Sequence, residues 1–246
     1  LWGRAMADMR LTTSGDTLTF DAGSGRLVSL QRAGAPGVEF LASAPEHPAF
    51  VIQYLDGAGA YRQLDSRAAE TTTVVLEDGV LTAQFGRLGG QAVDVRFTVR
   101  TDGRFSRWNL TVDNAAGLRI VDVQFPFVVA SYDLPGDRAV LRPLIMSELI
   151  ANPQPQDLPP DFPRTWQFTP ENGDSLHYPG GTFAQFIAYS SAAGGVYLAC
   201  DDTQAHVKLI KGVHRDPGIR LGIAHVGDWP AGSRTLEYDV LLGSFD

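Results

Sequence analysis

The chain has 246 residues, 44% of them hydrophobic, and a formal net charge of −8 at pH 7. This composition is apolar enough for a large core and excludes intrinsic disorder. The acidic charge, with no run of three basic residues, argues against nucleic-acid binding. No apolar run approaches the ~20 residues of a membrane span, so no membrane partner is expected.

Apolar and polar residues alternate along most of the chain, as expected for strands that bury one face. Asp-Gly pairs at 78–79 and 102–103 predict tight hairpin turns between such runs. In chain order, the pattern predicts strands at Thr17–Phe20, Arg26–Arg32, Phe50–Leu55, Thr73–Glu77, Val80–Phe85, Val93–Val99, Trp108–Val112, Ile120–Val129, Phe183–Tyr189, Gly195–Cys200, Val207–Ile210 and Leu236–Leu242.

No convincing amphipathic helix of ten or more residues interrupts these strands. Many short strands with Gly, Asn and Asp turns predict an all-β fold, a large antiparallel β-sandwich. We expect residues 1–246 to form a single domain, with residues 1–12 as a flexible or trimmed start because the chain begins at Leu1 without an initiator Met. With such a start, the sequence does not distinguish a protein of the bacterial cytoplasm from a secreted one.

Residues 151–179 break the strand pattern and hold seven of the fifteen prolines. Proline lacks the N–H that a central strand must donate, so this segment is not expected in a sheet core. It also carries Trp166, His177 and Tyr178. The aromatic content favours an ordered excursion that packs against something, because disordered segments are poor in aromatic residues.

The sequence predicts no catalytic residue. Glycoside hydrolysis needs two carboxyl groups about 5–9.5 Å apart on either side of one bond. Asp201 and Asp202 are adjacent, so in a strand they would point to opposite faces, and turn positions suit them better. Glu237 is expected to face solvent, and Cys200 to be a small buried apolar side chain. The five histidines form no metal-binding pattern, so no metal or cofactor is expected.

Carbohydrate binding is supported by residue types. Sugar rings stack on aromatic side chains, and their hydroxyl groups pair with planar polar groups. Trp166, His177 and Tyr178, with nearby Gln167 and Asn172, supply both kinds. Aromatic loops also seal domain interfaces, and the sequence supports that alternative equally.

Two stretches resemble known families. Leu18–Leu41, a strand, a Gly-Arg-Leu turn and a second strand, resembles the opening hairpin of galactose mutarotase-like supersandwich domains. His177–Lys211 is similar to a segment of large bacterial glycoside hydrolases of uncharacterised specificity, in which such a sandwich precedes a TIM barrel. The matching elements are Tyr178-Pro179-Gly180, Gln185–Tyr189, Gly194–Ala199, Asp201-Asp202 and Lys208. The resemblance adds Asp201, Asp202 and Lys208 to the candidate carbohydrate-binding residues.

This resemblance implies a supersandwich of roughly sixteen to twenty strands. It also implies a non-catalytic domain of a glycoside hydrolase, whose partners are carbohydrate and the catalytic barrel that carries the carboxylates. One alternative is a free-standing aldose 1-epimerase, which needs an acid and a base, usually Glu and His, facing one sugar ring. The pattern of that family includes an Asn-Arg pair and a His-Pro-Tyr-like element. The chain has no Asn-Arg pair, and its only His-Pro pair, His47-Pro48, is followed by Ala49. The other alternative is a purely structural sandwich without a sugar site.

Overall fold

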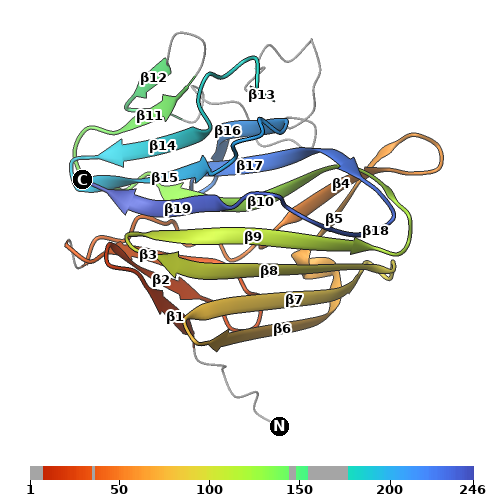
Figure 1. Ribbon diagram of the computed structural model, residues 1–246. Coiled ribbons are helices and arrows are strands. Elements are labelled where there is room, and N and C mark those ends of the chain that lie inside the picture. The colour runs from red at the N-terminus through yellow and green to blue at the C-terminus, as the bar shows by residue number, and fades with distance from the viewer. Residues whose placement is uncertain (1–7, 35–36, 144–147, 155–176) are drawn as a thin grey trace.

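The computed structural model describes residues 8–34, 37–143, 148–154 and 177–246. These residues form nineteen strands and one short 3-10 turn at Ser66–Ala68. The strands lie in three antiparallel sheets, which confirms the predicted all-β sandwich (Figure 1). Within the described ranges, no helix is long and apolar enough to cross a membrane.

The smallest sheet has the order β1-β2-β3. Its strands are β1 (Met9–Thr12), β2 (Asp16–Phe20) and β3 (Leu27–Arg32). β1 lies within the stretch predicted to be a flexible start, and it pairs with β2 along its whole length. Residues 9–12 therefore belong to a sheet, and Leu11 packs in the hydrophobic core.

The six-stranded sheet has the order β13-β16-β17-β10-β4-β5. Its strands are β4 (Val51–Leu55), β5 (Tyr61–Asp65), β10 (Arg119–Ser131), β13 (His177–Tyr178), β16 (Lys208–Arg215) and β17 (Gly218–Trp229). The two residues of β13 come from the proline-rich excursion and occupy an edge of this sheet. Most of the excursion, residues 155–176 with Trp166, lies outside the described residues.

The ten-stranded sheet has the order β12-β11-β14-β15-β19-β9-β8-β7-β6, and β18 pairs with β9 (Figure 1). Its strands are β6 (Ala69–Glu77), β7 (Val80–Leu88), β8 (Val93–Asp102), β9 (Phe105–Asn114), β11 (Ala139–Arg142), β12 (Glu148–Ala151), β14 (Phe186–Ser191), β15 (Gly194–Cys200), β18 (Gly232–Thr235) and β19 (Val240–Phe245). The β6–β7 turn uses Asp78 and Gly79 with φ of 50° and 74°, the positive values that a type I′ hairpin requires.

All three sheets contribute to one hydrophobic core. Phe97 on β8 lies near its centre, with ring centroids 5.8 Å from Phe85, 6.2 Å from Trp108 and 5.1 Å from Phe125. The polar residues that alternate with these apolar ones on β8 and β9 face away from the core. The period-two pattern thus decides which face each strand buries.

Two register shifts in β10 change this alternation. One lies between Ile120 and Asp122, and the other between Gln124 and Phe127. An extra residue in a strand reverses the direction of every later side chain. As a result Ile120 packs in the core while Asp122, Gln124 and Phe127 all lie on the sheet face that points away from it.

The predicted strand Leu236–Leu242 is only partly present. The regular strand begins at Val240, while Leu236 and Tyr238 lie in the irregular segment before it. Both are 8% exposed and belong to the core. The alternation of Leu236 and Tyr238 with polar residues thus correctly predicts which side chains are buried, although these residues do not form a regular strand.

Candidate functional site

Lys208, the first residue of β16, is the centre of a buried polar network. Its side chain is 0% exposed, and its ammonium group donates hydrogen bonds to Asp202 and, over 2.7 Å, to Gln185 Oε1. The ring centroids of Tyr178 and Tyr238 lie 4.8 and 4.6 Å from Nζ. A carboxylate, an amide and two aromatic faces thus replace the water that a buried ammonium loses.

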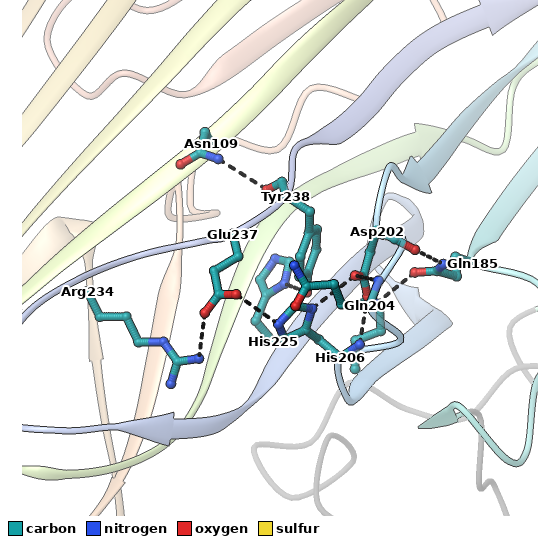
Figure 2. Close-up of polar contacts among 10 residues, drawn as sticks. Asn109, Gln185, Asp202, Gln204, His206, His225, Arg234, Glu237 and Tyr238 are labelled. Atoms are coloured by element: carbon teal, nitrogen blue, oxygen red, sulfur yellow. Dashed lines mark hydrogen bonds and ion pairs between the residues drawn. The ribbon is translucent and has the colours of Figure 1, made fainter.

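Asp202 organises the turn between β15 and β16 (Figure 2). Its carboxylate accepts hydrogen bonds from the backbone N–H groups of Gln204 and His206, 2.9 and 2.8 Å away, and from Lys208. Burial alone would raise the pKa of Asp202, but the hydrogen bonds from Lys208 and His206 outweigh it and lower the pKa to about 2. The structure confirms Asp202 as a turn residue. Its negative charge stabilises the backbone N–H groups of the turn and the ammonium group of Lys208.

His206 links this network to the surface. One ring nitrogen lies 2.9 Å from Asp202 Oδ1 and the other 3.3 Å from Glu237 Oε2, and Glu237 also pairs with Arg234 (Figure 2). The Glu237 side chain is 52% exposed, as predicted. The cavity beside His206 and Glu237 has a volume of only about 20 Å³. That is space for about one water molecule and excludes a sugar ring between the two side chains.

His225 lies beneath the same network, fully inside the sandwich. Its Nδ1 lies 2.6 Å from the Tyr238 hydroxyl and its Nε2 lies 2.5 Å from the Phe125 carbonyl oxygen. Burial lowers the pKa of His225 to about 3, so the ring is neutral at pH 7. Because a carbonyl can only accept, Nε2 donates to Phe125 and Nδ1 accepts from Tyr238. Because both ring nitrogens of His225 form hydrogen bonds within the fold, the residue has a structural role.

The structure places the predicted carbohydrate-binding residues in different environments. It brings Tyr178, Asp202 and Lys208 together, but in a closed network. Asp201 points to the opposite side, where its side chain is 50% exposed and accepts a hydrogen bond from Arg107 over 2.6 Å. His177 pairs with Leu209 at the sheet edge. Trp166 lies outside the described residues.

Cys200 ends β15 and packs against the core. Burial raises the pKa of its thiol to about 12, so the thiol stays protonated. A protonated thiol is a poor nucleophile, and this agrees with the packing role predicted for it.

A second cluster of polar side chains lies on the face of the six-stranded sheet that points away from the core. Gln53, Asp122, Gln124 and Arg220, called here the Asp122 row, are all buried, with exposures between 0% and 6%. Asp122 pairs with Gln53 across strands, and Arg220 donates to Gln124 Oε1 over 2.9 Å. The Arg220 guanidinium also lies 3.8 Å from the centroid of the Phe127 ring.

Asp122 is the unusual member of the row. Neither carboxylate oxygen makes a well-formed hydrogen bond within the described part of the chain. Burial raises the pKa of Asp122 to about 7, although Gln124 lies close enough to oppose this slightly. Ionising this carboxyl group in the folded protein is therefore costly near neutral pH.

Sequence reasoning missed the Asp122 row. In β10 the polar residues Asp122 and Gln124 read as an ordinary solvent-facing side of a strand. Nothing in a single sequence shows that this face is buried. The doublet Ile120-Val121 before Asp122 is the one local signal, because two consecutive apolar residues in an alternating strand can mark a bulge.

Comparisons with solved structures agree with the fold. A structure of the α-N-acetylgalactosaminidase of Bifidobacterium bifidum matches with a TM-score of 0.66 and 16% identity over 97% of this chain, which spans only 36% of that enzyme. A galactose mutarotase related enzyme of Lactobacillus acidophilus matches with a TM-score of 0.55 and 12% identity, over 98% of both chains. A candidate aldose 1-epimerase of Escherichia coli K12 matches with a TM-score of 0.53 and 12% identity, over 97% of this chain and 99% of that one.

No protein-family model and no curated protein matches the sequence. At these identities the structural matches establish the fold alone. The chain has the galactose mutarotase-like sandwich fold, which it shares with one part of a bacterial glycosidase and with proteins of its own length.

Proposed function

We propose that this chain is a non-catalytic, carbohydrate-associated sandwich domain of a larger glycoside hydrolase, in which it supports a catalytic barrel. The observation that carries the proposal is the glycosidase comparison, in which nearly the whole chain corresponds to about a third of the enzyme. The remaining length of such an enzyme has room for a separate catalytic domain. In this proposal the sandwich contributes stability and sugar contacts, and the barrel contributes the reacting carboxylates.

The acidic groups around Lys208 support a non-catalytic role. Asp202 is committed to Lys208 and to two backbone N–H groups, and its low pKa makes it a poor proton donor. Asp201 faces another side and pairs with Arg107. A glycosidase needs two carboxyl groups that face one bond, with one protonated near neutral pH. Neither aspartate meets that requirement.

An aldose 1-epimerase is the second candidate function, favoured by the end-to-end match to a mutarotase-related enzyme. Epimerisation needs a general acid and a general base that both reach the sugar ring. His206 and Glu237 are the His–Glu pair in the Lys208 network, but they contact each other beside a cavity of about 20 Å³. Small-molecule pockets usually measure about 300–1,000 Å³. The local geometry therefore favours the non-catalytic proposal.

We expect the purified chain to leave the mutarotation rate of fresh α-galactose and α-glucose unchanged. General acid–base catalysis typically contributes about 10²–10⁴-fold, so a working site would be obvious in polarimetry. An equal concentration of free histidine is the control. A rate well above that control, lost in Glu237→Gln, would establish the epimerase instead.

The main proposal is tested by binding without turnover. N-acetylgalactosamine is the first probe, because the similar Bifidobacterium enzyme has been solved in complex with GalNAc. We expect weak, saturable heat in isothermal titration calorimetry and no release of p-nitrophenol from the α-N-acetylgalactosaminide. Absence of binding to N-acetylgalactosamine, galactose and glucose would leave a purely structural sandwich.

A further inference from the structure

An open groove of about 260 Å³ lies on the outer face of the ten-stranded sheet, the face that points away from the core. Side chains of β8 and β9 line it, together with Thr235 of β18 and Asp239 just before β19. This volume is much larger than the 20 Å³ beside His206 and close to the lower end of the usual range for small-molecule pockets, about 300–1,000 Å³. The groove therefore has room for about one sugar ring.

The strand register builds the groove from two rows of polar side chains. The outward residues of β8 alternate with its core residues, and each faces a polar partner on β9: Arg96 pairs with Thr111, Thr98 with Asn109 and Arg100 with Arg107. At about 3.3 Å per residue, Arg96 and Arg100 lie about 13 Å apart along β8. The groove thus has two distinct ends, each marked by arginine.

The arginines at one end are already neutralised. Arg100 and Arg107 face each other across the strands, and like charges in such a pair repel. Asp239 lies 2.6 Å from the Arg100 guanidinium and 3.7 Å from that of Arg107. Arg107 also pairs with Asp102 and Asp201, over 2.5 and 2.6 Å. This end of the groove has no positive charge left for a ligand.

Arg96, at the other end, has no such partner. It is exposed and forms no hydrogen bond or ion pair with the residues that the structure describes. Asp94 and the exposed Asp113 continue the two rows beyond it, but Asp94 accepts from the backbone N–H of Arg87 over 2.8 Å. The Arg96 guanidinium thus keeps its donors for a ligand, and its planar fork matches a carboxylate.

Groups that can bind hydroxyl groups lie next to Arg96. The Thr98 hydroxyl has no hydrogen-bond partner in the described ranges, and it is partly exposed. Asn109 donates through Nδ2 to Asp239 and to two backbone carbonyl groups, which fixes its side chain and leaves Oδ1 as an acceptor facing the groove. The hydroxyl groups of Thr111 and Thr235 lie 2.8 Å apart along the same wall. Donors and acceptors of this kind suit the hydroxyl groups of a sugar.

We propose that this groove binds a saccharide that carries a carboxylate, such as a hexuronate. The carboxylate pairs with Arg96, and neighbouring hydroxyl groups bind Thr98 and Asn109. Asp239 repels an anion at the other end, so the sugar lies with its carboxylate toward Arg96. The inference rests on the proposed function and deepens it by naming the class of sugar and the face of the sandwich that binds it.

The test compares galacturonate with galactose, which has an uncharged CH₂OH group in place of the carboxylate. Both are titrated by calorimetry at pH 7 into the full chain and into Arg96→Gln. We expect the wild type to prefer galacturonate about tenfold, and Arg96→Gln to lose this preference, because a charge-assisted hydrogen-bonded pair is lost. Arg10→Gln is the matched control, since Arg10 is also exposed and lies on β1 of the smallest sheet. Acetate tests whether charge alone is sufficient.

A preference for galacturonate that is lost in Arg96→Gln and kept in Arg10→Gln would support the inference. Galactose binding as tight as that of galacturonate, or a preference that Arg96→Gln leaves unchanged, would overturn it and leave the proposed function intact. Loss of the preference in both variants, or acetate binding as tight as that of galacturonate, would overturn it in favour of unspecific charge. A wild type that binds neither sugar would overturn it together with the sugar-binding part of the proposed function. Thermal melting of each variant separates lost binding from lost folding.

Discussion

Lys208→Met is expected to destabilise the protein by about 3–5 kcal/mol, because removing one partner of a buried ion pair leaves the other charge unpaired. The Lys208 ammonium and the Asp202 carboxylate are 0% and 1% exposed, so water cannot replace the missing partner. The cation–π contacts with Tyr178 and Tyr238 are lost as well. Such a loss is a large share of the total stability of a typical domain. Urea denaturation followed by circular dichroism measures it.

A matched pair of variants isolates the cause. Lys208→Met combined with Asp202→Asn removes both charges and keeps an acceptor for the turn, so it should recover much of the lost stability. Arg62→Met removes the partner of Asp56 from an ion pair whose arginine side chain is 60% exposed, and it should change the midpoint little. A Lys208→Met midpoint equal to that of Arg62→Met would show that the buried pair contributes nothing.

Asp122→Asn is expected to stabilise the protein at pH 8 and to have little effect near pH 4. Burial raises the folded-state pKa of Asp122 from 3.8 to about 7. The folded wild type therefore keeps its proton longer than the unfolded chain and loses stability as pH rises between these values. The full change is on the order of 4 kcal/mol, because each pH unit is worth about 1.4 kcal/mol. Asparagine does not ionise and escapes this loss.

The measurement is the difference between the variant and the wild type at each pH. His225 has the opposite effect, because its pKa is lowered to about 3 and the wild type gains stability as pH rises toward 6.5. The wild-type profile alone would therefore be nearly flat between about pH 4 and 6.5. Urea midpoints of Asp122→Asn, with exposed Asp113→Asn as control, separate the two contributions. An Asp122→Asn advantage that is the same at pH 4 and pH 8 would contradict the raised pKa.

Together the two predictions describe two buried carboxylates with opposite energetics. Asp202 is paired, hydrogen-bonded and held ionised, while Asp122 is unpaired and held close to its neutral form. The first is explained by the stability of a turn. The second costs stability at neutral pH, because burial disfavours the ionised carboxylate.

Much of the fold was determined by local pattern. Alternation over Val93–Val99 and the Asp78-Gly79 turn predicted strands and a hairpin that the structure contains, because side-chain direction and turn geometry depend on neighbouring residues. Asp201 and Asp202 follow the end of β15 and contact different partners, Arg107 and Lys208. The short strands β11, β12 and β18 escaped prediction, because strands of four residues carry too few alternations to stand out.

The candidate site was decided by the tertiary structure. Lys208 and Asp202 are six residues apart, but the burial of their pair depends on Tyr178 and Tyr238, which come from distant parts of the chain. The burial of Asp122 could not be predicted from the sequence for a related reason. A polar residue in an alternating strand faces away from the core, and the sequence alone does not show whether that side meets water or other protein. Burial is a property of the assembled sheets, and it is burial that raises the pKa of Asp122 and leaves its oxygens in need of partners.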